Sequence, residues 1–371
     1  MKKILFIKKG KFSRVNAGIL NQMHKYFPDY TIEVLDIGDL LFRKHPYLLV
    51  FNFFPFLLNY GPDFLRGYKN LGDVKKVMLC TPYLFRKMRQ IINQKVLQGA
   101  YTFTLQTQSI HDYSTRGIPH FIYTDHTALV NHYYPDINLR KYKKSDSYLS
   151  LEPSIYTNAR RVFVLGSHVA RSLVEQYALP PENVRCIGAG NNVVLKEELT
   201  GKQYNQKNIL FVGIEWKRKG GPLLVSAFRE VLKVHPDAHL TIVGCKPNVD
   251  LPNCHVLGKI PVEEVTGYFQ AATVFCMPSV REPFGIVYIE AMLFKLPVVA
   301  LNIGATADFI QHGHNGYLVD KKPDEIAQVL NQLLSNPTKC RAMGERGYPI
   351  AKRFTWDQVG ARLKAHIDEC I

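Results

Sequence analysis

Short apolar runs alternate along the chain with longer segments in which apolar residues recur at helical spacing. The short runs predict buried strands, and the longer segments predict amphipathic helices. The strand-like runs are KILFIKK, TIEVLDIG, YTFTLQTQS, HFIYTDHT and RRVFVLGS in the first half, and NILFVG, HLTIVG, CHVLG, TVFCMPS and PVVALN in the second. Strands that are apolar along most of their length and alternate with helices indicate parallel sheets covered on both faces. The pattern therefore predicts an α/β protein with two Rossmann-like domains.

The pattern lapses between Gly188 and Asn208, where Gly, Asn, Lys and Gln accumulate before the next strand-like run. We therefore expect an N-terminal domain over residues 1–201 and a C-terminal domain over residues 202–353. A last helix, within residues 354–371, follows the strands of the second domain, and we expect it to pack on the first domain. The length of 371 residues agrees with two hydrophobic cores.

The composition, with 46% hydrophobic and 21% charged residues, is typical of a soluble globular protein. No apolar stretch reaches the roughly 18 residues that a membrane-spanning helix needs. The N-terminal apolar run, Ile4–Ile7, is too short for a signal peptide and predicts a strand. Seven cysteines form no C-x-x-C pair, so we expect reduced thiols and a cytoplasmic protein.

The net charge of +16 is concentrated in residues 1–190, which hold 26 Lys and Arg against 13 Asp and Glu. This charge favours an anionic partner, which could be a nucleic acid, an anionic membrane surface or a phosphorylated substrate. The aromatic segment His45–Asn70 has two interpretations. It is either a core strand or helix, or an interfacial patch that lies among lipid head groups with basic residues nearby.

The segment Arg281–Gly304, REPFGIVYIEAMLFKLPVVALNIG, places a Pro-Phe-Gly step between a predicted strand and a predicted helix. At the carboxyl end of a parallel strand, the start of a helix directs unpaired N–H groups towards a ligand. Phe284, Gly285 and Ile286 supply those groups here, and a glycine lets a ligand approach closely. Phosphates or sugar hydroxyls suit such a site.

Two glutamates flank this step, Glu282 in the loop and Glu290 one turn into the helix. A carboxylate can accept hydrogen bonds from vicinal hydroxyls, so one glutamate can hold a ribose and the other a sugar. The spacing alone is weak evidence for a functional pair, because an ordinary loop charge at Glu282 and an ordinary helix-surface charge at Glu290 would give the same sequence pattern.

The segment from REPFG to GYLVD closely resembles the donor-site signature of retaining glycosyltransferases of family 4. Members of this family have the GT-B fold, in which two Rossmann-like domains face each other across a cleft. The resemblance implies that Glu282 contacts donor-sugar hydroxyls beside the reacting carbon and that Glu290 binds the nucleotide ribose. It also implies donor contacts from the backbone of Phe284, Gly285 and Ile286.

The run NILFVGIEWKRKGG resembles the first strand and loop of the family's donor domain, where a basic pair holds the diphosphate. Lys219 matches the family lysine. The commoner family arginine is absent, because Ile214 follows Gly213, and either Arg218 or Lys217 is its replacement. Without the glutamate motif, this basic run would be interpreted as a solvated turn.

Two further matches extend the resemblance. The runs HLTIVGCKPN and CHVLGKIP resemble strands whose ends flank the base, which implies that Gly244, Lys259 and Ile260 lie near it. In the first domain, HFIYTDHT resembles a strand that family members end with a histidine facing the donor sugar, which implies a catalytic role for His126. Asp125 and His120 are alternatives, and a lone histidine is more often structural.

These matches imply a retaining hexosyltransferase that uses a nucleotide sugar, with UDP as the expected nucleotide and no other cofactor. The sequence contains no D-x-D pair, so we expect no metal. Lys219, a basic neighbour and the helix start would instead stabilise the leaving nucleotide. The expected acceptor is a glycan or a lipid, and the lipid choice would place the protein peripherally at the inner membrane face.

Other classes fit less well. A nicotinamide oxidoreductase needs G-x-G-x-x-G after a strand, which neither half has, and no nucleic-acid-binding module is evident. We therefore expect no nucleic-acid partner. A nucleotide-sugar epimerase or hydrolase on the same scaffold is the main alternative. A non-catalytic partner subunit is another, favoured by the missing arginine.

Overall fold

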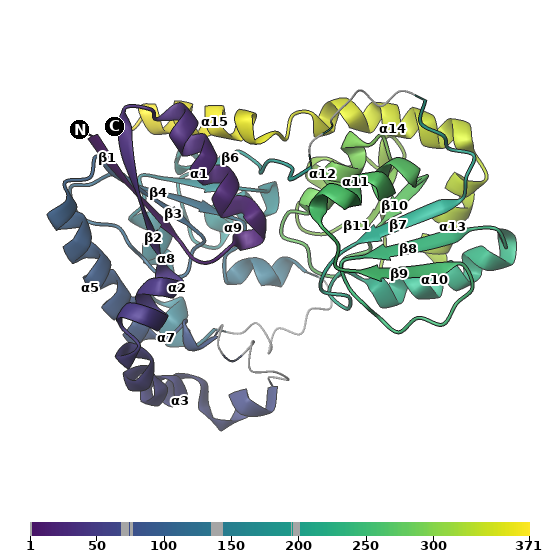
Figure 1. Cartoon of the computed structure of the whole chain (residues 1–371). Coiled ribbons are helices and arrows are strands. Elements are labelled where there is room, and N and C mark those ends of the chain that lie inside the picture. The colour runs from purple at the N-terminus through teal and green to yellow at the C-terminus, as the bar shows by residue number, and fades with distance from the viewer. Residues whose placement is uncertain (1, 68–73, 75–76, 135–143, 194, 196–200) are drawn as a thin grey trace. The chain divides into compact units, whose positions relative to one another are not determined.

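The computed structural model describes the chain except residues 1, 68–73, 75–76, 135–143, 194 and 196–200 (Figure 1). The chain divides into two compact units. Unit 1 comprises Met1–Gly188 and Trp356–Ile371, and unit 2 comprises Ala189–Thr355. The chain therefore leaves unit 1, forms all of unit 2 and returns to unit 1 for its last helix.

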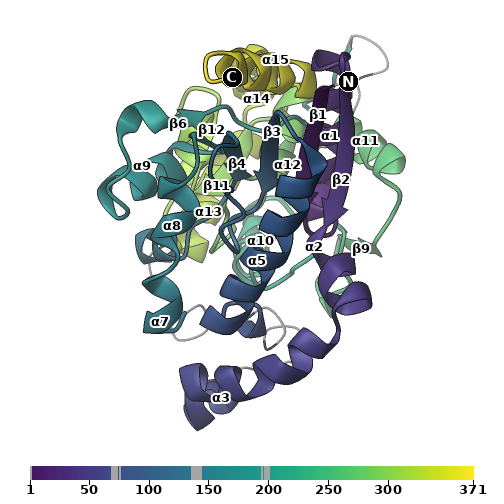
Figure 2. The same cartoon turned by 90° about the vertical axis from the view of Figure 1, so that its left-hand side faces the viewer.

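Unit 1 is built on a six-stranded sheet in the order β2-β1-β3-β4-β5-β6, in which all neighbouring strands are parallel. The strands are β1 Lys2–Lys8, β2 Tyr30–Asp36, β3 Phe103–Thr107, β4 His120–Thr124, β5 Arg161–Val164 and β6 Val184–Cys186. Every residue of β3 and β4 is buried, because helices lie on both faces of the sheet (Figures 1 and 2). The expected parallel sheet of the first domain is confirmed.

All the described helices of unit 1 except the last lie between these strands in the sequence. The helices are η1 Phe12–Arg14, α1 Val15–Tyr26, α2 Ile37–Asp39, η2 Leu40–Lys44, α3 Tyr47–Gly67, α5 Pro82–Gly99, η3 Leu129–Tyr133, α7 Asp146–Leu149, α8 Pro153–Thr157, α9 Ser167–Glu175, η4 Pro181–Asn183 and α15 Trp356–Asp368.

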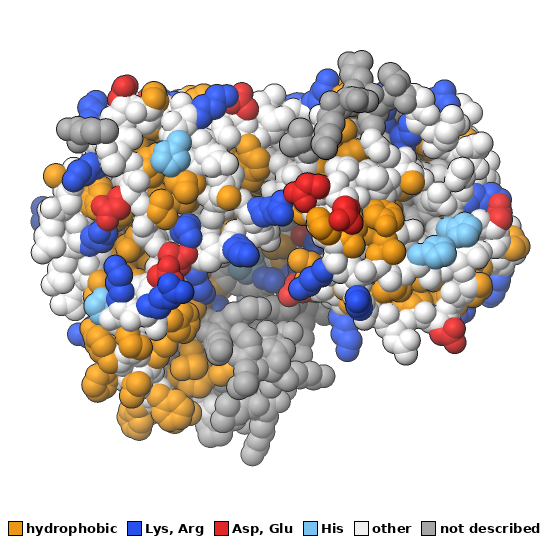
Figure 3. Space-filling view, viewed as in Figure 1, with side chains coloured by type: hydrophobic (Ala, Val, Ile, Leu, Met, Phe, Trp, Pro, Cys, Tyr) orange, Lys and Arg blue, Asp and Glu red, His pale blue; other side chains and the backbone are white. Residues whose placement is uncertain are grey.

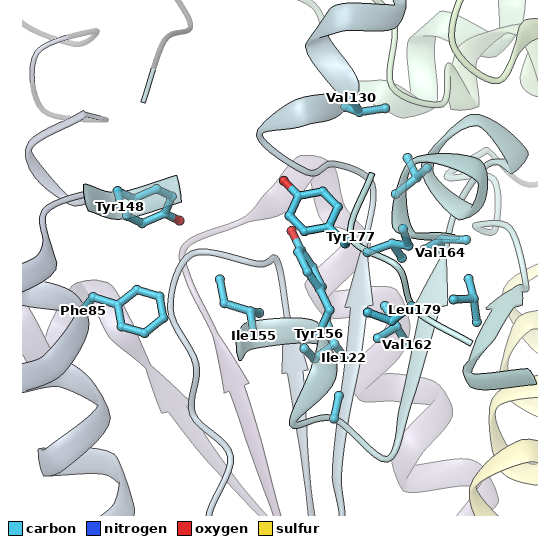
Figure 4. Close-up of a cluster of buried hydrophobic side chains, with 14 of the residues drawn as sticks. Phe85, Ile122, Val130, Tyr148, Ile155, Tyr156, Val162, Val164, Tyr177 and Leu179 are labelled. Atoms are coloured by element: carbon cyan, nitrogen blue, oxygen red, sulfur yellow. The ribbon is translucent and has the colours of Figure 1, made fainter. Parts of the chain in front are cut away.

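Part of the core of unit 1 lies between β4, β5 and the helices beside them (Figure 4). This cluster encloses Glu152, whose carboxylate accepts hydrogen bonds from the hydroxyls of Tyr156 (3.1 Å) and Tyr177 (2.7 Å) and from the backbone N–H of Ala128 (2.9 Å). Burial raises the pKa of Glu152, and the hydrogen bonds offset part of that rise. The buried carboxyl group is thus accommodated by the polar ends of core tyrosines.

The last helix, α15, packs against α1 within unit 1. Gly18 of α1 makes this contact close, since a Cβ atom there would lie 2.3 Å from the ring of Trp356. An ion pair between Lys25 and Asp357 and a hydrogen bond from the Tyr26 hydroxyl to Asp357 join the same helices. The expectation that the last helix returns to the N-terminal domain is confirmed.

Unit 2 contains a second six-stranded parallel sheet, in the order β12-β11-β10-β7-β8-β9. Its strands are β7 Asn208–Val212, β8 His239–Val243, β9 Cys254–Gly258, β10 Val274–Cys276, β11 Val298–Leu301 and β12 Gly316–Val319. Its helices are α10 Gly221–Val234, α11 Val262–Ala271, α12 Ile286–Leu293, η5 Thr306–Asp308, α13 Pro323–Leu334 and α14 Pro337–Ala351. The expected second parallel sheet is confirmed.

The strand order of unit 2 reverses between β7 and β10. From β7 the chain proceeds outwards to β8 and β9, then crosses back to β10 on the other side of β7. The carboxyl ends of strands at such a reversal form the usual ligand-binding edge of an open parallel sheet. The two loops that leave β7 and β10 therefore lie where a ligand is expected.

The aromatic segment forms α3, with a break at Gly61, where φ is +61°. One side of α3 buries Leu48, Asn52 and Phe56, while several other apolar residues are exposed. One face of the helix is therefore part of the core, as the first interpretation expects, and the other face is exposed. Residues 68–70 of the segment lie outside the described residues. No helix in the described parts of the chain is long and apolar enough to cross a membrane.

Candidate functional site

The loop after β7, residues 213–220, is a compact turn. The ring of Trp216 packs on Phe211 of β7, with 5.3 Å between ring centroids, and covers Gly221. The backbone N–H of Lys219 donates to the carbonyl of Glu215 (2.8 Å). The side chain of Lys219 passes over Gly213, where a Cβ atom would lie 2.9 Å from Lys219 Cγ. The loop thereby fixes the path of Lys219.

The loop after β10 is joined to the loop after β7. The backbone N–H of Val280 donates to the carbonyl of Arg218 (2.9 Å), and Arg218 Nη1 donates to the carbonyl of Arg281 (2.8 Å). Gly220 has a φ of +76°, and a Cβ atom there would lie 1.7 Å from the carbonyl oxygen of Pro278. Only glycine allows the loops to meet this closely.

These loops enclose Glu282, whose residue is only 4% exposed. Its Oε2 lies 2.5 Å from Lys219 Nζ and 3.9 Å from Arg218 Nη1, and it accepts a hydrogen bond from Ser279 Oγ (3.0 Å). Burial acts to raise the pKa of Glu282, but Lys219 and Arg218 outweigh it and hold the pKa below its ordinary value. Glu282 is therefore an anion at neutral pH in a mainly positive setting.

Helix α12 begins directly after Gly285, which has a φ of +92°. A Cβ atom at Gly285 would lie 2.5 Å from the ring of Tyr288, whose hydroxyl donates to the carbonyl of Met277 (2.6 Å). The ring of Phe284 is buried against Phe309, while the backbone of Phe284 is part of the loop before α12. The first N–H groups of α12, from Ile286 onwards, thus begin at the strand-end edge.

Glu290 lies one turn into α12 and is only 8% exposed. Its Oε1 accepts a hydrogen bond from the backbone N–H of Asn192 (2.9 Å). The preceding residue, Asn191, donates its own backbone N–H to the carbonyl of Phe354 (3.0 Å). Glu290 is therefore a positioned, buried carboxylate and not an ordinary helix-surface charge.

Glycines bring the ends of β7, β8 and β9 close together. Gly244 has a φ of +98°, and a Cβ atom there would lie 2.7 Å from the carbonyl oxygen of Gly213. The backbone N–H of Gly244 donates to the carbonyl of Gly258 (2.7 Å). Beyond Gly258, Lys259 is exposed and Ile260 is half-buried. This part of the edge is formed mainly by backbone.

His126 belongs to unit 1 and follows the carboxyl end of β4. Its Nε2 lies 3.2 Å from Asn131 Nδ2, and its carbonyl accepts a hydrogen bond from Ser109 Oγ (2.7 Å). His120 begins the same strand at the opposite edge, where burial lowers its pKa to about 4. Of these two histidines, only His126 is at the edge where ligands bind to parallel sheets.

The loop after β1 also lies at the carboxyl edge of unit 1. Phe12, Ser13 and Arg14 have φ values of 44°, 50° and 67°, a conformation that costs non-glycine residues energy. The amide of Asn16 holds this loop, since Nδ2 donates to the carbonyl of Gly10 (2.7 Å) and Oδ1 accepts from Thr107 Oγ1 (2.7 Å).

The structure brings Lys219, Arg218, Glu282 and the start of α12 together at one edge of unit 2. Lys217 is exposed, so Arg218 is the basic neighbour that contacts this cluster. Sequence reasoning missed Trp216, Ser279 and Asn192. A tryptophan within a basic loop and a serine at a strand end were the available signals for the first two. Within the described residues, no group of three or more His, Cys, Asp or Glu could hold a metal ion.

Residues 196–349 match the family model described as glycosyl transferases group 1. Among curated proteins, the D-inositol 3-phosphate glycosyltransferase of Corynebacterium aurimucosum is 27% identical over 242 residues, which are 57% of this chain and 58% of that protein. The corresponding protein of Corynebacterium jeikeium is 28% identical over 282 residues, or 67% of this chain and 66% of that protein. The chain thus spans little more than half the length of the former relative.

Solved structures resemble nearly the whole chain. Sucrose-phosphate synthase from Thermosynechococcus elongatus has a TM-score of 0.70 at 16% identity, covering 100% of this chain and 99% of that one. Anabaena HepE in complex with UDP and glucose has a TM-score of 0.66 at 17% identity, covering 99% of this chain and 100% of that one. At such identities the likeness shows the fold, and the expected GT-B fold is confirmed.

Proposed function

Because residues 196–349 match the family model described as glycosyl transferases group 1, we propose that this chain moves a sugar from a nucleotide-sugar donor to an acceptor hydroxyl. The observation that carries the proposal is the buried Glu282 beside Lys219 and Arg218, at the strand-order reversal of unit 2. Cations and the start of a helix favour a diphosphate, and an ionised carboxylate can accept hydrogen bonds from sugar hydroxyls.

The diphosphate would take Lys219, Arg218 and the first N–H groups of α12 as its partners. The backbone groups at that point belong to Phe284, Gly285 and Ile286. Gly285 has a left-handed conformation and no side chain that could block the diphosphate. These fixed positive groups would stabilise the negative charge that develops on the leaving nucleotide. The reaction therefore needs no metal to meet that charge.

The sugar and the nucleoside would bind on either side of the diphosphate. Glu282 remains ionised at neutral pH because of its two cations, so it can accept hydrogen bonds from sugar hydroxyls. Glu290 would accept hydrogen bonds from the ribose. Lys259, Ile260 and the glycine-rich backbone around Gly213 would flank the base.

In the proposed reaction, the acceptor oxygen attacks the anomeric carbon on the side of the leaving group. The bond from that carbon to the phosphate oxygen breaks, a new glycosidic bond forms, and the acceptor proton passes to the leaving phosphate. This front-face route retains the anomeric configuration.

His126 of unit 1 would contact the donor sugar. UDP is the proposed nucleotide, supported by the fold that the chain shares with UDP-bound HepE. The proposed acceptor is a lipid or glycan hydroxyl.

Calorimetry of the full chain against UDP-, GDP- and ADP-sugars, with EDTA present, tests the donor site. We expect one nucleotide sugar to bind selectively, and Lys219→Met to weaken that binding by roughly 10- to 100-fold, the worth of a charge-assisted hydrogen bond. Lys233→Met, at an exposed lysine of α10, is the matched control and should bind like the wild type. Absence of binding by the wild type to every nucleotide sugar would contradict the proposal.

Product analysis separates the transferase from its main alternative. With the selected donor and a panel of lipid and glycan acceptors, we expect a new glycoside with retained configuration. Glu282→Gln should abolish its formation, whereas Glu264→Gln, at an exposed residue of α11, should not. Release of free sugar or of an epimerised donor, without a glycoside, would instead identify a hydrolase or an epimerase.

A further inference from the structure

Helix α3 exposes an apolar stripe that no described part of the chain covers. Tyr47, Val50, Phe51, Phe54 and Leu58 follow one another at helical spacing and are 50%, 74%, 64%, 67% and 72% exposed. We call these five residues the α3 face. Figure 3 shows the hydrophobic side chains gathered over α3 at the lower left of the molecule. Contiguous exposed apolar surface of this kind marks an interaction site.

The opposite side of α3 is firmly attached to unit 1. Leu48 and Phe56 are each 3% exposed, so this side is part of the core. Asn52 is fully buried, donates from Nδ2 to the carbonyl of Met78 (2.8 Å) and accepts a hydrogen bond from the Thr81 hydroxyl. The α3 face cannot turn inwards without breaking these contacts, so its exposure is a fixed property of the fold.

Positive charge borders the α3 face. A groove of about 340 Å³ is lined by Leu58 and Pro55 of α3 and by Tyr83, Arg86 and Lys87 from the first turns of α5. Arg86 and Lys87 are exposed and have no ion-pair partner among the described residues. Helix α5 as a whole contains no acidic residue. The border therefore complements an anionic surface.

The apolar α3 face and its basic border together distinguish between the partners that could bind there. A second copy of this chain would present the same basic border, and the like charges would oppose self-association through this face. Aromatic and aliphatic side chains flanked by Lys and Arg are instead typical of helices that lie at a membrane surface. Because α3 is not a membrane-spanning helix, it would lie along the surface and not across it.

We propose that the α3 face inserts among the head groups of a bilayer containing anionic lipids, with Arg86 and Lys87 contacting the lipid phosphates. Insertion would remove the five apolar side chains from water, and the cations would add electrostatic attraction. The proposal is independent of the transferase activity, since it concerns only unit 1 and needs no donor.

Co-sedimentation of the full chain with vesicles tests the apolar part of the proposal. Vesicles of phosphatidylcholine mixed with phosphatidylglycerol should bind the wild type. Phe51→Gln/Phe54→Gln should weaken this binding by more than about tenfold. The matched control, Leu97→Gln/Val234→Gln, changes two side chains that are 68% and 58% exposed elsewhere and should leave binding unchanged. Equal binding by the wild type and the α3 variant would overturn the proposal.

The charge requirement is tested with vesicles of phosphatidylcholine alone and with added salt. Arg86→Gln/Lys87→Gln should weaken binding to anionic vesicles by about fivefold per residue removed. Arg229→Gln/Arg346→Gln, which removes two exposed charges from unit 2, should have little effect. Equal binding of the wild type to neutral and anionic vesicles, or to neither, would overturn the proposal.

Two further measurements keep these outcomes interpretable. Circular dichroism and nucleotide calorimetry should be unchanged in the α3 variant, because its substitutions are on the surface of unit 1 and leave the donor edge of unit 2 untouched. Sedimentation velocity without lipid should show a monomer. A dimer that the α3 variant abolishes, together with no vesicle binding, would assign the α3 face to a second copy and overturn the proposal.

Discussion

Glu282 shows how burial and charge compete at a single residue. Its depressed pKa means that it contributes stability above the pKa of the unfolded chain, and that this contribution is lost as the pH falls through the folded pKa. Without Lys219, burial would dominate and the ionised carboxylate would be unfavourable at neutral pH. The ion pair thus stabilises the folded state as well as forming part of the proposed donor site.

Lys219→Met should therefore lower the free energy of unfolding by roughly 3 kcal/mol near pH 7, as expected for a buried charge that loses its partner. The loss should shrink near pH 4, where Glu282 of the variant takes up a proton. Urea unfolding at the two pH values measures both effects. In Lys233→Met, which removes a surface pair with Glu230, the change should be below about 1 kcal/mol. A loss that does not vary with pH would show that charge is not the cause.

Gly285 is required by conformation and by space. Gly285→Ala should destabilise unit 2 by more than about 1 kcal/mol, because its φ of +92° strains alanine and the new Cβ overlaps the ring of Tyr288. Gly267→Ala, in the open middle of α11, should instead stabilise by about 0.5–1 kcal/mol. Chemical denaturation of both variants makes the comparison, and similar effects in both would argue against a special role for Gly285.

At the residue scale, the sequence predicted some neighbours and not others. Lys219 and Glu282 follow adjacent parallel strands, so their proximity could be expected from the order of apolar runs and the motif resemblance. The choice of Arg218 over Lys217 depends on the direction of each side chain in a tight turn, which no periodicity encodes. The contact between Asn192 and Glu290 joins residues distant in sequence and required the fold.

Among the elements, α3 is where the sequence pattern was least informative. Every residue of strands β3 and β4 is buried, and the sequence runs that contain them predicted both strands directly. In α3, apolar residues occur on every side, so no polar stripe indicates which side faces the core. The structure identifies the inner side by the burial of Leu48 and Phe56 and by the polar contacts of Asn52 with Met78 and Thr81.

The contact between α1 and α15 gives a prediction at this scale. Gly18→Val should lower the free energy of unfolding by about 1–3 kcal/mol and speed amide exchange in α15, because its side chain overlaps the ring of Trp356. Ala17→Val changes the neighbouring, exposed position of α1 and should leave α15 protected. Hydrogen exchange read by mass spectrometry measures both, and unchanged protection in Gly18→Val would contradict the tight contact.

For the whole molecule, acid should affect the two units unequally. His111, His120 and His168 are buried in unit 1, and burial lowers the pKa of each to about 4. The unfolded chain has histidine pKa values near 6.5, so it binds more protons than the folded unit between these values. Between pH 6.5 and pH 4, the free energy of unfolding of unit 1 should fall by up to roughly 1 kcal/mol per histidine for each pH unit. The protection of backbone amides against exchange, corrected for the pH dependence of the intrinsic exchange rate, should therefore fall first in unit 1 as the pH falls.

His168 offers a matched test of this cause. Its ring nitrogens have no hydrogen-bond partner among the described residues, so a leucine of similar volume costs no hydrogen bond. His168→Leu should stabilise the protein more near pH 5 than near pH 7.5. His24→Leu, at an exposed position on α1, should show no such difference. Thermal unfolding at both pH values measures the stabilisation. Equal stabilisation by His168→Leu at both would exclude His168 as a source of acid sensitivity.

The return of the chain to unit 1 has a consequence for how the protein is made. A ribosome releases residues in order, so the sheet of unit 1 emerges before its last helix, and all of unit 2 is synthesised in the interval. During that interval, the α1 surface around Gly18 that Trp356 will cover is open to water and to chaperones. Unit 2 is continuous in sequence and can complete its fold first. The first half of this chain is thus the last part of it to be finished.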